Sequence, residues 1–164
     1  RRWPSRPVGV GLRWGAVVEG GVWAARVLAY RHVVVAGRSL VERLGLPDSV
    51  QALHRFPCAA WSSGANTASS WQLGEETFAP RSVLTTNDYA HLRDRALAGD
   101  VVTELPPFLA TPALRTGKLI ALLPDEPMPE QQLHLLYPSH RRPSHIVRPY
   151  LAFSTQPRPP LATT

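Results

Sequence analysis

The sequence predicts an α/β fold with a largely parallel sheet. Short apolar segments that read as strands alternate along the chain with segments of helical periodicity, the pattern expected of strands joined by crossover helices. With 164 residues, 44% of them hydrophobic, the chain can bury a substantial core in one domain or in two small lobes. No internal repeat is found.

The first third of the chain predicts two strands and a short helix. "VGVGLRW" at 8–14 alternates apolar residues with glycine and arginine, which is typical of a strand. "VLAYRHVVVAG" at 27–37 is long, apolar and β-branched, so we expect a strand buried on both faces. Ser39 and Glu42 have capping-box spacing and predict a helix that Gly45 ends.

The middle of the chain predicts one more helix and two strands around a polar loop. Asp48 is expected to cap a helix over residues 49–56. "CAAW" at 58–61 predicts a strand that leads into a loop of small polar residues, and "FAPRSVLTT" at 78–86 predicts the next strand.

A longer amphipathic helix is predicted over "DYAHLRDRALA", with Asn87 as its cap and Gly99 at its end. Its spacing places four residues on a core face. These are Tyr89, Leu92, Ala96 and Leu97.

The remaining third predicts alternating strands and helices. Strands are expected at 100–106, 118–125 and 132–139. A proline-started helix at 106–117 is expected to break near Pro112, and a last helix is expected to begin near Ser144. Residues 157–164 predict a disordered tail.

Composition and charge limit the classes of function. The formal net charge of +6 permits contact with nucleic acid, but the arginines are scattered singly, which indicates a compositional bias more than a docking face. A single cysteine, Cys58, excludes an internal disulfide and a multi-thiolate metal site. We expect its thiol to be buried in the fold and the protein to occupy a reducing compartment. No segment is long and apolar enough to span a bilayer, and no export signal follows Arg1, so a cytoplasmic location is expected.

Enzyme motifs were sought and not found. Ser39 in "GRSLV" lacks the second glycine of a nucleophile elbow, and Gly117-Lys118 lacks the earlier glycine of a phosphate-binding loop. The histidines show no metal-binding spacing and are interpreted as surface or helix-face residues. They are His32, His54, His91, His134, His140 and His145. We therefore expect no catalysis, no cofactor and no metal.

Four segments, in order, resemble one protein family. They read "VGVGLRWG", "VWAARVLAYRHVVVAGRSLVERLGLPDSVQALHRFPCAAWSSG", "TTNDYAHLRDRALAGDVVTELPPFL" and "LYPSHRRPSHIVRPYLAF". Their wording is similar to that of the C-terminal effector-binding domain of LysR-type transcriptional regulators, over about residues 7–156.

The resemblance implies a periplasmic-binding-protein type 2-like fold of two α/β subdomains joined by two crossover strands. Residues 1–29 and 137–156 would belong to an incomplete first subdomain, and residues 30–136 to the second. The family's winged helix-turn-helix and linker helix are expected to precede Arg1, so the chain is interpreted as N-terminally truncated.

Ligand groups in such a fold come from strand ends and helix starts. The candidate ligand-binding residues are Trp14, Gly15, Ser62, Ser63, Thr86, Asn87, Asp88, Pro107 and Phe108. Alternatives stay open: Asn87 could serve only as a helix cap, the serines could form an ordinary loop, and Trp14 and Phe108 could complete a core.

The function expected from the resemblance is effector sensing. A small molecule, such as an organic acid, would bind between the subdomains of a dimer or tetramer and control DNA binding by the missing N-terminal domain, with no contact to membrane. Three alternatives are a solute-binding component of a transporter, a small hydrolase, and a fragment without independent function.

Overall fold

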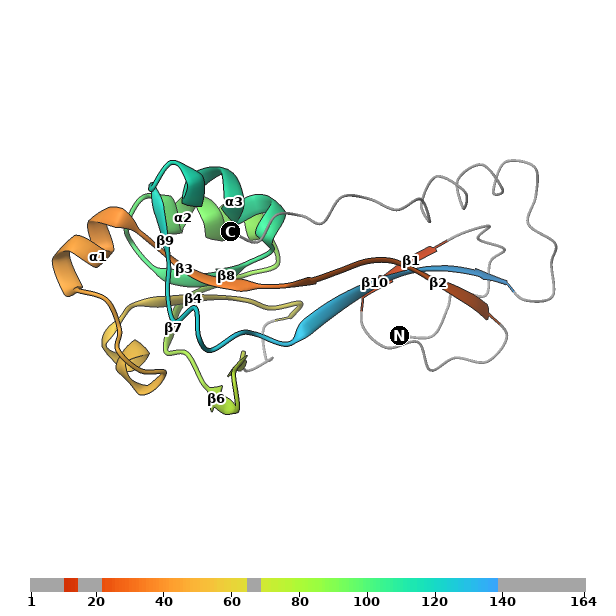
Figure 1. Ribbon diagram of the computed structural model, residues 1–164, viewed down its shortest axis with the longest axis horizontal. Helices are drawn as coiled ribbons and strands as arrows, with labels where there is room; N and C mark the ends of the chain where they lie inside the picture. Colours follow the sequence, from red (N-terminus) through yellow and green to blue (C-terminus); the bar gives the residue numbers. More distant parts are fainter. Residues whose placement is uncertain (1–10, 15–21, 65–68, 139–164) are drawn as a thin grey trace. The chain divides into compact units, whose positions relative to one another are not determined.

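The structure is a computed structural model that describes residues 11–14, 22–64 and 69–138 (Figure 1). The chain divides into two compact units. Unit 1 contains the described residues up to Tyr30 and from Gln131 onward, and unit 2 is Arg31–Glu130. The helix predicted near Ser144 and the predicted tail at 157–164 lie outside the described residues.

Unit 1 is built on a three-stranded sheet in the order β1-β10-β2. Its strands are β1 (Gly11–Trp14), β2 (Val22–Arg31) and β10 (Glu130–Pro138). β1 runs antiparallel to β10, and the buried side chains of Leu135 and Leu136 lie on β10. The strands predicted at 8–14 and 132–139 are confirmed for their described residues.

Unit 2 contains a five-stranded sheet in the order β7-β4-β8-β3-β9. Its strands are β3 (Val33–Gly37), β4 (Cys58–Trp61), β7 (Ser82–Thr86), β8 (Val102–Leu105) and β9 (Leu119–Ala121). β4 is parallel to β7 and β8, whereas β3 is antiparallel to β8 and β9. The largely parallel sheet predicted from the sequence is therefore wrong at β3, because β3 enters directly from β2 without a crossover helix.

The single strand predicted at 27–37 is in fact two strands that meet at His32. Val34–Gly37 are buried in the middle of unit 2, as predicted, but the described residues of β2 are exposed or half-buried. The prediction fails for β2 because that strand belongs to the small sheet of unit 1, which covers it less completely.

Two hydrophobic clusters cover the two faces of the unit 2 sheet. Helices α2 (Tyr89–Leu97) and α3 (Pro107–Arg115) lie side by side over one face (Figure 1). The other cluster includes residues of α1 (Arg38–Leu44), of the 3-10 turn η1 (Gln51–Arg55) and of the hairpin β5 (Trp71–Leu73) and β6 (Glu76–Phe78). Val34 and Val35, adjacent on β3, belong to different clusters, as the two-residue period of a strand requires.

The β5–β6 hairpin was not predicted. Trp71, Leu73 and Phe78 are buried on it, and Gly74 makes its turn at a φ of 54°. The strand predicted at 78–86 therefore starts later, at Ser82, and Phe78 belongs to the hairpin. The two strands cannot be recognised in the sequence, because three residues each are too few to show an alternating pattern.

The predicted cap at Ser39 is wrong. α1 already begins at Arg38, follows Gly37 without a side-chain cap and ends at Gly45, which has the predicted positive φ of 79°. Gly37 is required by packing, because a Cβ at this position would lie 2.2 Å from the backbone oxygen of Ala96. The close approach of α2 therefore leaves no room for a side chain at the residue before α1.

The predicted cap at Asp48 is also wrong. The Ser49 hydroxyl accepts the Ala52 N–H at 3.3 Å and donates to Asp48 at 3.1 Å. The turn that follows is a 3-10 helix instead of an α-helix. The 3-10 turn begins two residues later than the predicted helix, its N-cap residue is Val50 without a side-chain cap, and Ser49 supports the turn just before it.

Pro112 does not break α3. The helix has nine residues and continues past the proline to Arg115. Because the helix is short, the proline removes one backbone donor near the middle of only two to three turns. The Thr116 hydroxyl donates to the carbonyls of Pro112 and Ala113, both at 3.2 Å, and supports the last turn.

Candidate functional site

One edge of the unit 2 sheet gathers strand ends and helix starts. Since β4, β7 and β8 are parallel, their carboxyl ends lie at the same edge, where Trp61 is paired with Thr86. The start of β3 lies there too, because Val33 is paired with Leu105 at the end of β8. α2 and α3 begin directly after β7 and β8. We call this region the carboxyl edge.

The structure brings two predicted site segments together at the carboxyl edge. The Ser62 N–H donates to the Thr86 carbonyl at 3.0 Å, so the loop after β4 adjoins the turn that leads into α2. Ser63, Asn87 and Asp88 are exposed on these two segments. Polar side chains from both loops therefore face solvent at one place.

The other predicted site residues lie at the start of α3, on the same edge, or in unit 1. Pro107 and Phe108 begin α3 after β8; Pro107 is buried, and Phe108 is 45% exposed. Trp14 ends β1 in unit 1, and Gly15 lies outside the described residues. Whether any of these residues binds a ligand stays a prediction.

The turn before α2 shows that Asp88, and not Asn87, caps the helix. The Asp88 carboxylate accepts the Ala90 N–H at 2.8 Å, and Thr86 Oγ1 accepts the Asp88 N–H at 3.3 Å. The helix starts one residue later than predicted, so capping does not explain Asn87. Its exposed amide remains available to an external partner.

Ser62 is less available than Ser63. The Ser62 hydroxyl donates to the Gly64 carbonyl at 2.7 Å and accepts the Gly64 N–H at 3.3 Å. Its single proton is therefore directed to its own loop. The exposed Ser63 and Asn87 are the better candidates for hydrogen bonding to a small molecule.

An aromatic pair lies beside these polar groups. Trp61, at the end of β4, stacks on Tyr89, the first residue of α2, with ring centroids 6.0 Å apart and planes at 15°. Trp61 remains 37% exposed. Its open ring can contact a planar apolar group.

A buried polar network lies behind the aromatic pair. The Tyr89 hydroxyl donates to Glu104 Oε1 at 3.1 Å, and His32 Nδ1 pairs with Glu104 Oε2. His32 also meets the Tyr89 ring edge-on, with centroids 5.2 Å apart. The network connects the start of β3, the end of β8 and the start of α2.

Sequence reasoning missed this network and wrongly placed His32 on the surface. The side chains of His32 and Glu104 are only 10% and 8% exposed. A signal was present, because Glu104 lies within "VVTEL", a strand-like run in which a charged residue requires a partner. The identity of that partner depends on strand pairing.

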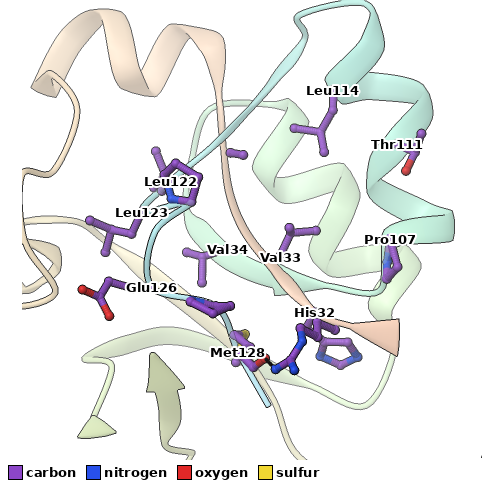
Figure 2. Close-up of a pocket in the computed structure, with 14 residues that line it drawn as sticks. His32, Val33, Val34, Pro107, Thr111, Leu114, Leu122, Leu123, Glu126 and Met128 are labelled. Carbon is purple, nitrogen blue, oxygen red and sulfur yellow. Dashed lines mark hydrogen bonds between the residues drawn. The ribbon is translucent and has the colours of Figure 1, made fainter. Parts of the chain in front are cut away.

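A cavity of about 410 Å³ lies on the other side of β3, toward β9 (Figure 2). Its walls come from residues 31–34, from one side of α3 and from the segment 121–128. It shares His32, Val33 and Pro107 with the carboxyl-edge residues described above. Arg31 is one of the lining residues, and its guanidinium donates from Nη1 to the Met128 carbonyl at 2.8 Å.

Two negative findings concern the described residues. Among residues 11–14, 22–64 and 69–138, no cluster of three or more His, Cys, Asp or Glu side chains could hold a metal ion. Within the same ranges, no helix has the length and apolar character needed to cross a bilayer.

The family model of the LysR substrate binding domain matches residues 6–156. The chain belongs to this family. This LysR substrate-binding domain is 26% identical over 150 residues to the HTH-type transcriptional regulator PtxR of Pseudomonas aeruginosa, and the alignment covers 88% of the chain and 47% of PtxR. The chain thus spans about half the length of the curated relatives it matches.

Solved structures of other LysR-type regulators share the fold. The LysR substrate-binding domain superposes on the regulatory domain of CrgA from Neisseria meningitidis with a TM-score of 0.78 and 22% identity, over 90% of this chain and 74% of that one. Full-length AphB of Vibrio cholerae gives a TM-score of 0.79 and 19% identity, over 89% and 51%. The predicted family and the periplasmic-binding-protein type 2-like α/β fold are confirmed.

Proposed function

We propose that the chain is the effector-sensing part of a LysR-type transcriptional regulator and that its effector binds at the carboxyl edge of unit 2. The family match over residues 6–156 supports the regulatory role. The stacked Trp61 beside the exposed Asn87 and Ser63 supports the place of binding. This juxtaposition of an open aromatic ring and free polar groups is the single observation that carries the proposal.

The chemistry of the edge favours a planar molecule with hydrogen-bonding groups. Trp61 offers a ring face, while Asn87 and Ser63 can both donate and accept. The described residues of the edge supply two carboxylates, Asp88 and Glu104, and their basic group, His32, is paired with Glu104. An organic acid, as expected from the sequence, would therefore need its carboxylate held by another part of the protein.

In this proposal no covalent bond of the effector is made or broken. It binds one conformation of the domain better than another and shifts the population toward it. DNA is bound by a segment other than residues 6–156, because that range matches the substrate-binding domain alone. Assembly into a dimer or tetramer and a cytoplasmic location belong to the same proposal.

The proposal is tested by a thermal-shift screen of the whole chain with a panel of aromatic compounds, amino acids and organic acids. A compound that binds the folded state raises the melting temperature by mass action. We expect the shift of a hit to be lost in Trp61→Ala and reduced in Asn87→Ala, because both side chains touch the molecule.

Val83→Ala is the matched control, because Val83 is 70% exposed on β7 and lies away from the carboxyl end. Its shift should equal that of the unaltered chain. The proposal is wrong if no compound raises the melting temperature, or if hits raise it equally in Trp61→Ala and Asn87→Ala.

A further inference from the structure

We infer that the cavity on the β9 side of β3 is a second small-molecule site, which takes a carboxylic acid with a compact aromatic or branched apolar body. The cavity measures about 410 Å³, within the range of about 300–1,000 Å³ typical of ligand sites. Its lining residues all belong to unit 2. The inference goes beyond the proposed function, because it concerns another place and another ligand chemistry.

The walls of the cavity define the ligand's body. Val33 and Val34 of β3, Leu114 of α3, and Leu122 and Met128 contribute apolar side chains (Figure 2). Water is displaced from such a surface when an apolar group binds, at roughly 25 cal/mol per Å² of area buried. A purely polar molecule would gain little here.

The cavity is shaped by stiff backbone. Pro107, Pro124 and Pro127 line it, and proline fixes its own φ. A cavity that is already formed spares the ligand the entropy cost of ordering loops. The walls therefore suit a compact body that fills the space, and a long flexible chain would lose more entropy on binding.

The charges around the cavity define the ligand's polar group. Arg31 brings a guanidinium with several N–H donors, and among the described residues its Nη1 donates to the Met128 carbonyl. That bond holds the group in place without neutralising it. A carboxylate can accept from the remaining donors, and charge-assisted hydrogen bonds of this kind are among the stronger ones.

The acidic groups near the cavity do not oppose a carboxylate. Glu126 lines the cavity, but its carboxylate is turned away from His32 and Pro107 (Figure 2) and packs against Gly74, where an added Cβ would collide with Glu126 Oε2. Glu104 is engaged by His32 and Tyr89. Arg31 is therefore the basic group that a ligand carboxylate in the cavity would meet.

The position of the cavity gives its occupant a means of regulation. Residues 31–34 run from the end of β2 into β3, and the segment 121–128 leads into β10, so the ligand would touch both connections by which the chain enters and leaves unit 2. The Arg31–Met128 hydrogen bond already joins them. A bound acid would add a second bridge between the same two segments.

The test uses 4-isopropylbenzoate as the probe and its neutral analogue 4-isopropylbenzamide, titrated into the methyl-labelled whole chain and followed by NMR. We expect saturable shifts of the Val34, Leu114 and Leu122 methyl resonances, with the acid binding about tenfold more tightly than the amide, as a charge-assisted hydrogen bond predicts. Arg31→Gln should weaken the acid by about the same factor and leave the amide unchanged.

Two further variants test the location. Leu114→Trp and Thr111→Phe fill the cavity and should each abolish binding of both probes. Two separate variants are used so that the test still holds if one of them does not fold. Arg115→Gln on the same helix and Leu46→Trp on an exposed position are the controls, because neither residue lines the cavity. Both controls should bind like the unaltered chain.

Three outcomes overturn the inference: no saturable shift at millimolar probe, equal affinity for acid and amide that Arg31→Gln leaves unchanged, or binding that survives in both filled variants. An acid that instead shifts resonances around Trp61, and is lost in Trp61→Ala, binds the carboxyl edge. That result would support the proposed function while rejecting the second site, so the two fail separately.

Discussion

At the scale of single residues, Glu104 brings a carboxylate into a strand of which every residue is buried. Burial of an unpaired charge is costly, and here the charge is held by the Tyr89 hydroxyl and by His32. Each partner belongs to a different element. The network therefore links the start of β3 to the start of α2, where the proposed effector site lies.

We predict that Glu104→Gln lowers the free energy of unfolding by about 1–3 kcal/mol, because it weakens two buried contacts at once. Urea unfolding of the whole chain measures it. Combined with Tyr89→Phe in a double-mutant cycle, the two changes should cost less than the sum of the single ones. The exposed Glu42→Gln is the control. Strict additivity would show that Tyr89 and Glu104 do not interact.

Cys58 gives a prediction about pH. Burial raises the pKa of its thiol from 9.0 to about 12. The unfolded chain therefore loses this proton first, so the contribution of the thiol to stability is complete below pH 9.0 and falls as the pH rises toward 12. The expected slope is about 1.4 kcal/mol per pH unit within that window.

The slope is measured by urea unfolding between pH 9 and 11, and Cys58→Ala should remove this part of it. At pH 8 an aromatic disulfide such as dithiobis(nitrobenzoate), which forms a mixed disulfide and releases its aryl thiolate, should react slowly with the native chain and fast in denaturant. Rapid reaction of the native chain, or an unchanged slope in Cys58→Ala, would contradict the buried position.

The candidate site could be predicted only in part. Ser63 and Asn87 could be proposed from the sequence because strand ends and helix starts carry recognisable polar residues. Trp61, His32 and Glu104 were missed because their meeting depends on which strands pair and in what register. Periodicity within a segment does not contain that information.

At the scale of elements, the sequence predicts the apolar face of α2 but not the residue at which the helix begins. Its apolar face and its end near Gly99 agree with the sequence prediction, and Leu92 and Ala96 are buried. Its first residue does not, since both Asn87 and Asp88 are favourable caps. Only the geometry of the turn distinguishes the two residues.

We therefore predict that Asp88→Ala lowers the free energy of unfolding by about 1 kcal/mol, while Asn87→Ala leaves it unchanged. The Asp88 carboxylate accepts the Ala90 N–H, which loses its partner in the first variant. Urea unfolding compares the two variants directly. A larger loss in Asn87→Ala than in Asp88→Ala would return the cap to the position predicted from the sequence.

Among the other elements, some strands could be predicted from the sequence and others could not. Strand β4 was predicted because it is a continuous apolar run, and β8 because it lies in the strand-like run "VVTEL", whereas β5 and β6 were missed because three residues are too few to show a period. The reversal of β3 was also missed. Strand direction follows from the connection that precedes a strand, and a strand that enters from another sheet needs no crossover helix.

At the scale of the whole molecule, the two hydrophobic clusters lie entirely within unit 2. Every buried residue in them belongs to Arg31–Glu130. Among the described residues of unit 1, Leu135 and Leu136 are the buried hydrophobic side chains. Unit 2 therefore holds most of the apolar burial that stabilises the described part of the chain.

This distribution predicts that a fragment of residues 31–130 folds on its own. We expect a cooperative urea transition and dispersed methyl resonances like those of the same residues in the whole chain, because a domain with its own core needs no neighbour. A shorter fragment, residues 31–121, is the comparison. It removes Leu122 and Met128 from their cluster, and the backbone bond from the Leu122 N–H to Val34.

The shorter fragment should be less stable by several kcal/mol, as the loss of two buried apolar side chains requires. Equal stability of the two fragments would mean that residues 122–130 add nothing to the core. If residues 31–130 instead unfold without cooperativity, the core depends on unit 1 for its stability, and the Arg31–Met128 hydrogen bond cannot be studied apart from it.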